Sequence, residues 1–303
     1  MSRALGLLLG YAADRLLADP RRGHPVAGFG SVAAALERRW WRDTRPAGVR
    51  YVAVLVGGAV VLGVLLERGG QPRRTLTVAA ATWAVLGGTS LDREGAVIER
   101  LLADGRLPEA RVQLTHLVGR DTSGLGEPAV VRAAVESLAE NTSDAVVAPL
   151  VWGAVAGIPG LLGHRAANTL DAMIGHRSAR HERFGWAAAR LDDLLNLPGS
   201  RVTALLAVVL GEDPRGAWRT WRRDAGAHPS PNAGPVEAAF AGALGVRLGG
   251  RNVYGDRVEH RAPMGDGRAP ERADLARARR LARRVGLVSA GIAAAVSWAS
   301  PSR

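Results

Sequence analysis

The feature that most constrains this chain is a set of four long apolar runs without Asp, Glu, Lys, Arg or His. They hold 16, 17, 19 and 18 residues and cover positions 51–66, 75–91, 145–163 and 285–302. A helix that crosses the hydrocarbon core of a bilayer needs about 20 mostly apolar residues, and the working range begins at about 17. Two shorter runs, 4–13 and 202–211, fit buried or interfacial helices, or the ends of spans that neighbouring polar residues complete. The pattern predicts an all-α, polytopic integral membrane protein with sizeable polar loops.

The charged residues support a membrane partner and exclude several chemistries. All 40 basic residues are arginine, against 28 acidic residues, which gives a net charge of +12. Without lysine, a phosphate-binding loop of the Gly-Lys-Ser/Thr type and Schiff-base catalysis are excluded. Without cysteine, disulfides, thiolate nucleophiles, iron–sulfur clusters and cysteine zinc sites are excluded as well. Because the arginines flank apolar runs and do not alternate with aromatic residues, the charge favours a lipid bilayer over nucleic acid.

The organisation along the chain is that of one domain. We find no internal repeat and no interdomain linker, so we expect residues 1–303 to form a single helical membrane domain. The polar regions expected to carry function are 92–144, 164–201 and 212–267. Arginines cluster before the first and last long apolar runs, at 38–50 and 272–284, which is typical of cytoplasmic loops. The segment 271–284 also fits an amphipathic helix on anionic headgroups, and we expect a multi-pass protein of the cell membrane.

A stripe of carboxylates precedes the third long run. Glu136, Glu140 and Asp144 recur at i, i+4 and i+8, and Asn141 adds a neutral oxygen beside them. Mg²⁺ prefers a few carboxylate oxygens together with water and phosphate oxygens, so the stripe is a possible metal site. The alternative is a solvated helix face on which Arg132 pairs with Glu136. Asp144 favours a functional site, because an unpaired carboxylate beside an apolar run is costly.

A second polar group follows the same run. His164, Asn168 and Asp171 lie at i, i+4 and i+7, with Arg165 adjacent and Arg177 after them. Planar guanidinium groups suit two-point recognition of phosphate or carboxylate. For His164 we favour a neutral interfacial histidine over a catalytic one.

A third group consists of Arg190, Asp192, Asp193 and Asn196. Adjacent aspartates point to different sides of a helix, so we expect one of the two to face a site and the other to cap or pair structurally. Near the N-terminus, His24 lies in a proline-containing loop that turn chemistry explains by itself.

The third long run raises a topological conflict. Asp144 and His164 bound it, and a straight helix of this length rises about 28 Å, which would put them on opposite membrane faces. Pro149, Gly153 and the Gly-Ile-Pro-Gly cluster at 157–160 are residue types that kink or break helices. The sequence therefore predicts a bent or re-entrant segment that returns both polar groups to one pocket.

Several motifs together are recognisable as those of a known family. They are GRDTSGLG (119–126), ESLAENTSDAVVAPL (136–150), NTLDAMIG (168–175), FGWAAARLDDLLN (184–196), HPSPNAG (228–234), LGGRNVYG (248–255) and His24-Pro25-Val26. In this order and spacing, the sequence resembles the CobD/CbiB family of cobalamin biosynthesis over nearly the whole chain. The stretch NLPGSR (196–201) departs from the family, which usually has Pro-Ala-Arg after the Asp-Asp-x-x-Asn stretch.

The resemblance implies a membrane-bound adenosylcobinamide-phosphate synthase that uses ATP and Mg²⁺. Such enzymes join aminopropanol or its phosphate to a propionate carboxyl of adenosylcobyric acid, and we expect an acyl phosphate intermediate. The expected Mg²⁺ ligands are Asp144, Glu140 and Asp171. The expected catalytic residues are Asp192, Asp193 and Glu140, of which Asp192 or Asp193 would accept a proton from the amine. The residues expected to bind substrate or phosphate are Arg165, Asn168, Arg177, Arg190, Asn141 and His24. Because ATP is cytoplasmic, we expect the active site to face the cytoplasm.

Two other function classes stay open at this point. One is an ion-coupled transporter in which Asp144 and Asp171 bind the coupling ion. The other is an intramembrane Mg²⁺-dependent phosphotransferase or prenyltransferase, although the repeated aspartate motifs of those enzymes are absent. The sequence also leaves open the choice of amine, the number of spanning helices and whether the chain forms a homo-oligomer.

Overall fold

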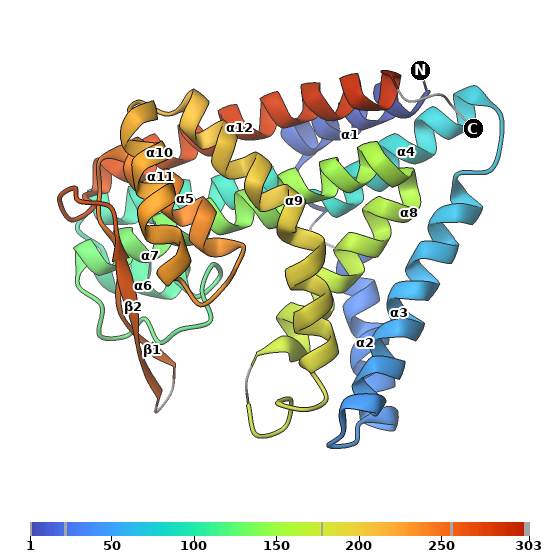
Figure 1. Ribbon diagram of the computed structural model, residues 1–303, viewed down its shortest axis with the longest axis horizontal. Helices are drawn as coiled ribbons and strands as arrows, with labels where there is room; N and C mark the ends of the chain where they lie inside the picture. Colours follow the sequence, from blue (N-terminus) through green and yellow to red (C-terminus); the bar gives the residue numbers. More distant parts are fainter. Residues whose placement is uncertain (1, 21–22, 177, 255–256, 300–303) are drawn as a thin grey trace. The chain divides into compact units, whose positions relative to one another are not determined.

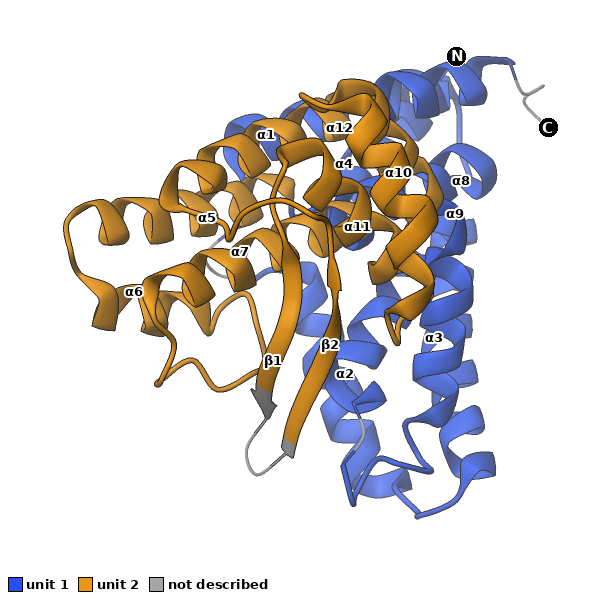
Figure 2. Cartoon of the chain, turned by 60° about the vertical axis from the view of Figure 1, so that its left-hand side comes forward, with its two compact units in different colours: residues 1–87, 144–199, 289–303 blue, residues 88–143, 200–288 orange. Residues whose placement is uncertain are grey.

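The fold is predominantly helical, as the predicted fold class requires. The computed structural model describes residues 2–20, 23–176, 178–254 and 257–299. The contacts between Cα atoms divide the chain into two compact units (Figure 2). Unit 1 comprises Met1–Gly87, Asp144–Gly199 and Ser289–Arg303, and unit 2 comprises Gly88–Ser143 and Ser200–Val288.

The regular secondary structure described in unit 1 is helical. The helices are α1 (Ser2–Leu17), α2 (Pro25–Trp40), α3 (Arg45–Leu66), α4 (Gln71–Val85), α8 (Ala148–Leu170), the first part of α9 (Trp186–Leu210) and the last part of α12 (Arg272–Ala299). In this unit α1 packs along α4, and α3 packs along α8 (Figure 1). A Cβ added at Gly6 of α1 would lie 2.6 Å from the Cβ of Val78 on α4. The glycine thus lets the backbones of α1 and α4 approach closely, as small residues do at helix–helix contacts in membranes.

Unit 2 combines helices with one antiparallel hairpin. Its elements are α5 (Gly88–Ala103), α6 (Leu107–Leu114), α7 (Glu127–Thr142), the end of α9, α10 (Pro214–Asp224), the 3₁₀ turn η3 (Ala225–Ala227), α11 (Ala233–Leu244), β1 (Leu248–Tyr254), β2 (Arg257–Met264) and the start of α12. Every residue of α11 is buried, and α11 and α7 contribute to one apolar core. The hairpin has a register shift between Leu248 and Gly250, and Gly249 and Gly250 both have positive φ. This bulge brings the backbone of β1 towards α7, a point that matters for the polar groups described below.

Three of the described helical segments are long and apolar enough to cross a membrane: Arg45–Leu66, Glu127–Gly175 and Trp186–Leu210. The first two contain the predicted apolar runs 51–66 and 145–163. The short run 202–211 falls almost entirely at the end of the third segment, so it completes a longer span, one of the two possibilities that its sequence left open. These segments support the predicted class of helical membrane protein.

The run 75–91 is a correction, because it does not form one helix. Helix α4 ends at Val85, Leu86 is extended, and α5 begins at Gly88. Glycine pairs have low helix propensity, and the Gly87 amide donates instead to the carbonyl of Ala145 at 3.2 Å.

The last apolar run also differs from the expectation. Its described part is the end of α12, a helix that starts at Arg272 and carries several arginines, and residues 300–302 lie outside the described residues. This part of α12 is not among the described segments that are apolar enough to span.

The predicted bend in the third run is confirmed. Within α8, Gly157 adopts φ 66° and ψ −145°, a conformation that only glycine takes readily, and Pro159 follows two residues later. The chain therefore changes direction in the middle of an apolar segment that would otherwise run straight.

Candidate active site

A buried polar network joins α8 to α9 in unit 1. After the bend, α8 carries His164, whose Nε2 lies 2.8 Å from Oδ1 of Asn196 on α9. One turn further along α8, Nδ2 of Asn168 donates to Oδ1 of Asp192 at 3.3 Å. The side-chain amide oxygen Oδ1 of Asn168 accepts from Nη1 of Arg165 at 3.4 Å. The second and third groups singled out in the sequence therefore meet at one place.

The adjacent aspartates of α9 diverge as expected. Asp192 is buried and faces Asn168. The side chain of Asp193 is 33% exposed and pairs with Arg190 at 3.3 Å, and Arg190 itself is mostly exposed. Asp192 is thus the carboxylate of this pair that belongs to the network, while Arg190 and Asp193 form a surface ion pair.

The bend in α8 brings the two ends of the third run towards each other. Asp144 and Asp19 both lie within electrostatic range of the Arg165 guanidinium. In a straight helix, 21 residues would separate Asp144 from Arg165 by about 31 Å. The geometric expectation that these polar groups return to one region is therefore met within unit 1.

Two π-helical turns flank α8, and the sequence reasoning missed both. They are η1 (Ser143–Val147), which contains Asp144, and η2 (Asp171–Gly175), which begins with Asp171. Single π turns within helices occur frequently at functional sites. A Cβ added at Gly175 would overlap the Asp171 carboxylate, so the glycine that closes NTLDAMIG gives this side chain room.

His24 has a structural task in this region. It is the N-cap of α2, and its Nδ1 accepts a hydrogen bond from the Val26 amide at 3.1 Å. Its Nε2 lies 3.4 Å from Oδ1 of Asp19. His24 therefore reaches the Arg165 region through Asp19, whereas Arg177 lies outside the described residues.

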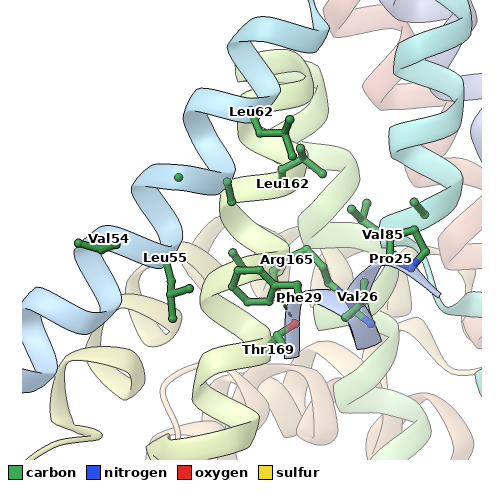
Figure 3. A pocket seen from close by; sticks show the side chains of 14 residues that line it. Pro25, Val26, Phe29, Val54, Leu55, Leu62, Val85, Leu162, Arg165 and Thr169 are labelled. Atoms are coloured by element: carbon green, nitrogen blue, oxygen red, sulfur yellow. Dashed lines mark hydrogen bonds between the residues drawn. The ribbon is translucent and has the colours of Figure 1, made fainter. Parts of the chain in front are cut away.

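A cavity of about 340 Å³ opens beside the network in unit 1 (Figure 3). It lies among α2, α3, α4 and α8, and Phe29, Leu55 and Leu162 are part of its apolar lining. Arg165 is the charged residue of the lining, and Thr169 adds a hydroxyl. Cavities of this size hold small ligands, with a few polar groups fixing the orientation. The arrangement suits a molecule with an apolar part and an anionic group.

A second polar group lies in unit 2, around Glu136 of α7. Its Oε2 accepts from Nη2 of Arg120 at 2.6 Å, and its Oε1 accepts from the Gly249 amide at 2.9 Å. Arg120 also donates to Asn252. Arg132 lies 4.0 Å from Glu136, the pairing that the sequence offered as the alternative to a metal site. Glu136 is buried, however, so it ties α7 to the hairpin and is not part of a solvated face.

The rest of the predicted stripe continues along α7 and into η1. Asn141 donates to the carbonyl and hydroxyl oxygens of Ser137, at 2.9 and 3.0 Å, within its own helix. Glu140 is half-buried on α7 in unit 2, whereas Asp144 belongs to unit 1.

Sequence reasoning also missed Glu237, a completely buried residue of α11. Among the described residues neither of its carboxylate oxygens has a hydrogen-bond partner. Nε2 of His228 lies 3.7 Å away and Nη1 of Arg261 lies 3.9 Å away. Burial raises the pKa of Glu237, and the charges of Glu136 and Glu140 raise it further. The sequence did contain a signal for Glu237, because it is an acidic residue inside the apolar stretch 233–244. A carboxylate next to apolar residues is also what singled out Asp144.

The described residues contain no group of three or more histidine or acidic side chains that could hold a metal by themselves. Mg²⁺ usually keeps several waters and binds through one or two carboxylates together with substrate phosphates. Asp171 and Asp192 lie within electrostatic range of each other, and Asp144 lies within range of Arg165. Among the described residues these carboxylates do not form a preassembled metal cage, and one or two of them suit an ion that also binds phosphate oxygens.

The fold and the network define a helical membrane protein with a buried polar site beside an apolar cavity. The CobD/Cbib protein family matches residues 7–282, and the chain belongs to that family. A cobalamin biosynthesis protein CobD of Mycobacterium tuberculosis is 55% identical over 299 residues, 96% of this chain and 94% of the relative. Those of Rhodobacter capsulatus and Chromobacterium violaceum are 45% and 43% identical, covering 87% and 94% of this chain and 86% and 93% of the relatives. No solved structure matches the chain. The resemblance drawn from the motifs is confirmed, and with it a role in cobalamin biosynthesis.

Proposed function

We propose that the chain is an adenosylcobinamide-phosphate synthase. In this reaction an ATP-dependent ligase joins (R)-1-amino-2-propanol, or its O-phosphate, to a propionate carboxyl of adenosylcobyric acid. Family membership supports the pathway. The observation that carries the chemistry is the buried α8–α9 network. In it Asp192 is hydrogen-bonded to Asn168, which in turn contacts Arg165, the charged residue of the apolar cavity.

The reaction needs activation of the acid, because a carboxylate and an ammonium ion do not form an amide at neutral pH. A carboxylate oxygen of the corrinoid attacks the γ-phosphorus of ATP, and ADP leaves. The amine nitrogen then attacks the acyl carbon of the resulting acyl phosphate, inorganic phosphate leaves, and the nitrogen loses a proton.

Each step has a residue suited to it in unit 1. Arg165 offers a guanidinium to the transferred phosphate, and the absence of lysine makes arginine the cation for this task. Asp192 accepts the proton of the amine, with Asn168 holding the carboxylate in place. Asp171 and Asp144 would hold Mg²⁺ with the nucleotide, and the ion would neutralise phosphate charge. The roles predicted for Glu140, Asn141, Arg177 and Arg190 remain predictions.

The proposed setting is the cell membrane, with the active site on the cytoplasmic side where ATP is found. The arginine cluster at 38–50 precedes the candidate span α3 and supports this orientation, because Glu37 beside it pairs with Arg180 close to Ser178. The chain contains no cysteine, so Ser178→Cys, at an exposed position before α9, gives a single reporter. A membrane-impermeant thiol reagent should label it from the cytoplasmic side of sealed vesicles, and labelling from the other side only would contradict the orientation.

Product analysis tests the reaction itself. Purified protein is given adenosylcobyric acid, ATP, Mg²⁺ and either amine, and the corrinoid is weighed by mass spectrometry. We expect the mass of one amide for one of the amines, and one ADP released per amide. A transporter would consume no ATP in detergent solution in response to acid and amine together. An unchanged corrinoid with both amines, in protein that stays folded, would contradict the proposal.

A further inference from the structure

Helix α10 of unit 2 carries an unusual concentration of arginine and tryptophan. Its 11 residues, Pro214–Asp224, read PRGAWRTWRRD. The rings of Trp218 and Trp221 meet edge to face with centroids 5.4 Å apart. The Arg222 guanidinium lies 5.8 Å from the Trp218 ring centroid. Arginine with tryptophan on a short helix is typical of a membrane–water interface.

One face of α10 packs on the protein and the other is open. Ala217 and Thr220 are buried, and Gly216 and Ala217 lie against Gly242 of α11 so closely that a side chain at Gly242 would not fit. The exposed residues of the open face are Arg215, Trp218, Arg219, Arg222 and Arg223. Arg223 is neutralised by Asp224 and Asp266. The other three arginines form no ion pair within the part of the chain that the structure describes.

The position of α10 relates this face to the bilayer. It follows the end of α9, a candidate span, after a linker of three residues, 211–213 (Figure 1). In the last turns of α9, Leu205 and Val209 are 50% and 63% exposed. Large apolar side chains exposed on a candidate span indicate contact with lipid, so α10 begins where the chain leaves the hydrocarbon.

A second set of arginines gathers at the same linker. Glu212 accepts from Nε of Arg277 on α12 at 3.0 Å. Arg280 and Arg284, both exposed and in the same unit, also lie within electrostatic range of Glu212. We define the arginine collar as Arg215, Arg219, Arg222, Arg280 and Arg284. Because Arg277 already pairs with Glu212, the collar carries an excess of positive charge at the end of α9.

We propose that the arginine collar binds the phosphate-bearing headgroups of anionic phospholipids at the membrane surface where α9 ends. A guanidinium group can donate two parallel hydrogen bonds to two oxygens of one phosphate. Trp218, which is 48% exposed, lies at the level of the headgroups. Each arginine near an anionic leaflet strengthens such binding by about fivefold. The inference is independent of the ligase reaction, since it uses none of the residues of the α8–α9 network.

The test is lipid retention by the full chain. The protein is reconstituted in nanodiscs of equal parts phosphatidylglycerol and phosphatidylcholine, extracted in mild detergent, and examined by native mass spectrometry. The collar variant is R215Q/R219Q/R222Q, and R215K/R219K/R222K keeps the charge. The matched control is R93Q/R100Q/R106Q, which removes three exposed arginines from α5 and the turn after it. Gel filtration and thermal unfolding check that each variant is folded.

We expect the wild type to retain phosphatidylglycerol over phosphatidylcholine. In the collar variant the ratio of retained phosphatidylglycerol to phosphatidylcholine should fall at least tenfold, while the lysine variant and the control keep most of the preference. Equal retention of the two lipids by the wild type would overturn the proposal. So would an equal loss in the control, or displacement of the lipid by short RNA at lower concentration than by soluble glycerol phosphate, which would indicate a nucleic-acid surface.

Discussion

The polar groups of the two units are built on different principles. In unit 1, the α8–α9 network pairs buried side chains mainly through the side-chain amides of Asn168 and Asn196. Asp192 therefore accepts a hydrogen bond but has no cationic partner among the residues that the structure describes. In unit 2, Glu136 is engaged at both oxygens by Arg120 and the Gly249 amide. A carboxylate held by an amide keeps acceptor capacity for a substrate, whereas one saturated by a guanidinium and a backbone amide serves the fold.

This difference changes how the predicted carboxylate stripe is understood. Glu136 lies at the start of the stripe but stabilises unit 2, and Asp144 lies at its end within electrostatic range of Arg165 in unit 1. The comparison therefore separates residues expected to affect catalysis from residues expected to affect stability.

The largest effect should come from removing the carboxylate of the α8–α9 network. Asp192→Asn deletes the proposed proton acceptor and should lower kcat by about 10²- to 10⁴-fold, with little change in the unfolding temperature. Asp193→Asn is the matched control, because it removes an exposed carboxylate one residue away and should keep activity within a few fold. Amide formation is followed by chromatography of the corrinoid. Equal losses in the two variants would remove Asp192 from its proposed role.

The next largest effect concerns the Arg120–Glu136 pair, whose loss should lower the free energy of unfolding without a specific loss of catalysis. Arg120→Gln leaves the buried Glu136 without its close cationic partner and should destabilise the protein by about 3 kcal/mol. Arg190→Gln breaks an exposed pair and should cost less than about 1 kcal/mol. Denaturant unfolding in detergent compares the two. If Arg120→Gln is as stable as Arg190→Gln, the buried pair does not anchor the hairpin to α7.

The bend that brings Asp144 towards Arg165 gives a third comparison. Gly157→Ala would force a side chain into a left-handed conformation and against the Glu67 carboxylate, which should destabilise the protein by about 1–3 kcal/mol. Gly57→Ala on α3 meets open space and should not destabilise the protein, because alanine favours a helix more than glycine does. Thermal unfolding of both variants measures the difference. A Gly157→Ala protein as stable as the wild type would mean that the bend is not needed.

The smallest effect concerns the buried carboxyl of unit 2. Because burial raises the pKa of Glu237, the folded state binds a proton that the unfolded state releases, and stability falls as the pH rises above the ordinary glutamate pKa towards the raised value. Glu237→Gln stays neutral, so it should flatten this dependence and be more stable than the wild type at pH 8 by about 1 kcal/mol.

Unfolding of Glu237→Gln at pH 5 and pH 8 checks the sign of this effect. Glu127→Gln is the control, because it replaces an exposed glutamate and should leave the pH dependence unchanged. A Glu237→Gln variant that is less stable than the wild type at both pH values would show that the carboxyl is charged and paired in the folded protein.

Local patterns predicted the parts of this fold that depend on neighbouring residues. The apolar runs around α3 and α8, the bend at Gly157 and the divergence of Asp192 from Asp193 all follow from helical spacing, hydropathy and backbone geometry. The family motifs NTLDAMIG and FGWAAARLDDLLN contain Asn168, Asp192 and Asn196, and helical spacing added His164, so the sequence pointed to these members of the α8–α9 network.

Contacts between distant parts of the chain were not predictable in this way. Glu136 accepts from Gly249, 113 residues away, and no spacing rule connects α7 to a glycine bulge in β1. Burial of Glu237 likewise depends on the elements packed around α11. The π turns at Asp144 and Asp171 have no sequence signature of their own. Gly87 and Gly88 interrupt the run 75–91, but the absence of charge in that run favoured a single helix.

Oxygen transfer from the corrinoid acid to phosphate tests the proposed ligase reaction most directly. Adenosylcobyric acid labelled with ¹⁸O at both oxygens of the reacting carboxyl is converted with ATP, Mg²⁺ and the amine, and the phosphate is analysed by mass spectrometry. An acyl phosphate predicts one ¹⁸O in each inorganic phosphate released and one retained in the amide carbonyl. Amide formation with unlabelled phosphate would contradict the account, because the carboxyl oxygen would then not have attacked the γ-phosphorus.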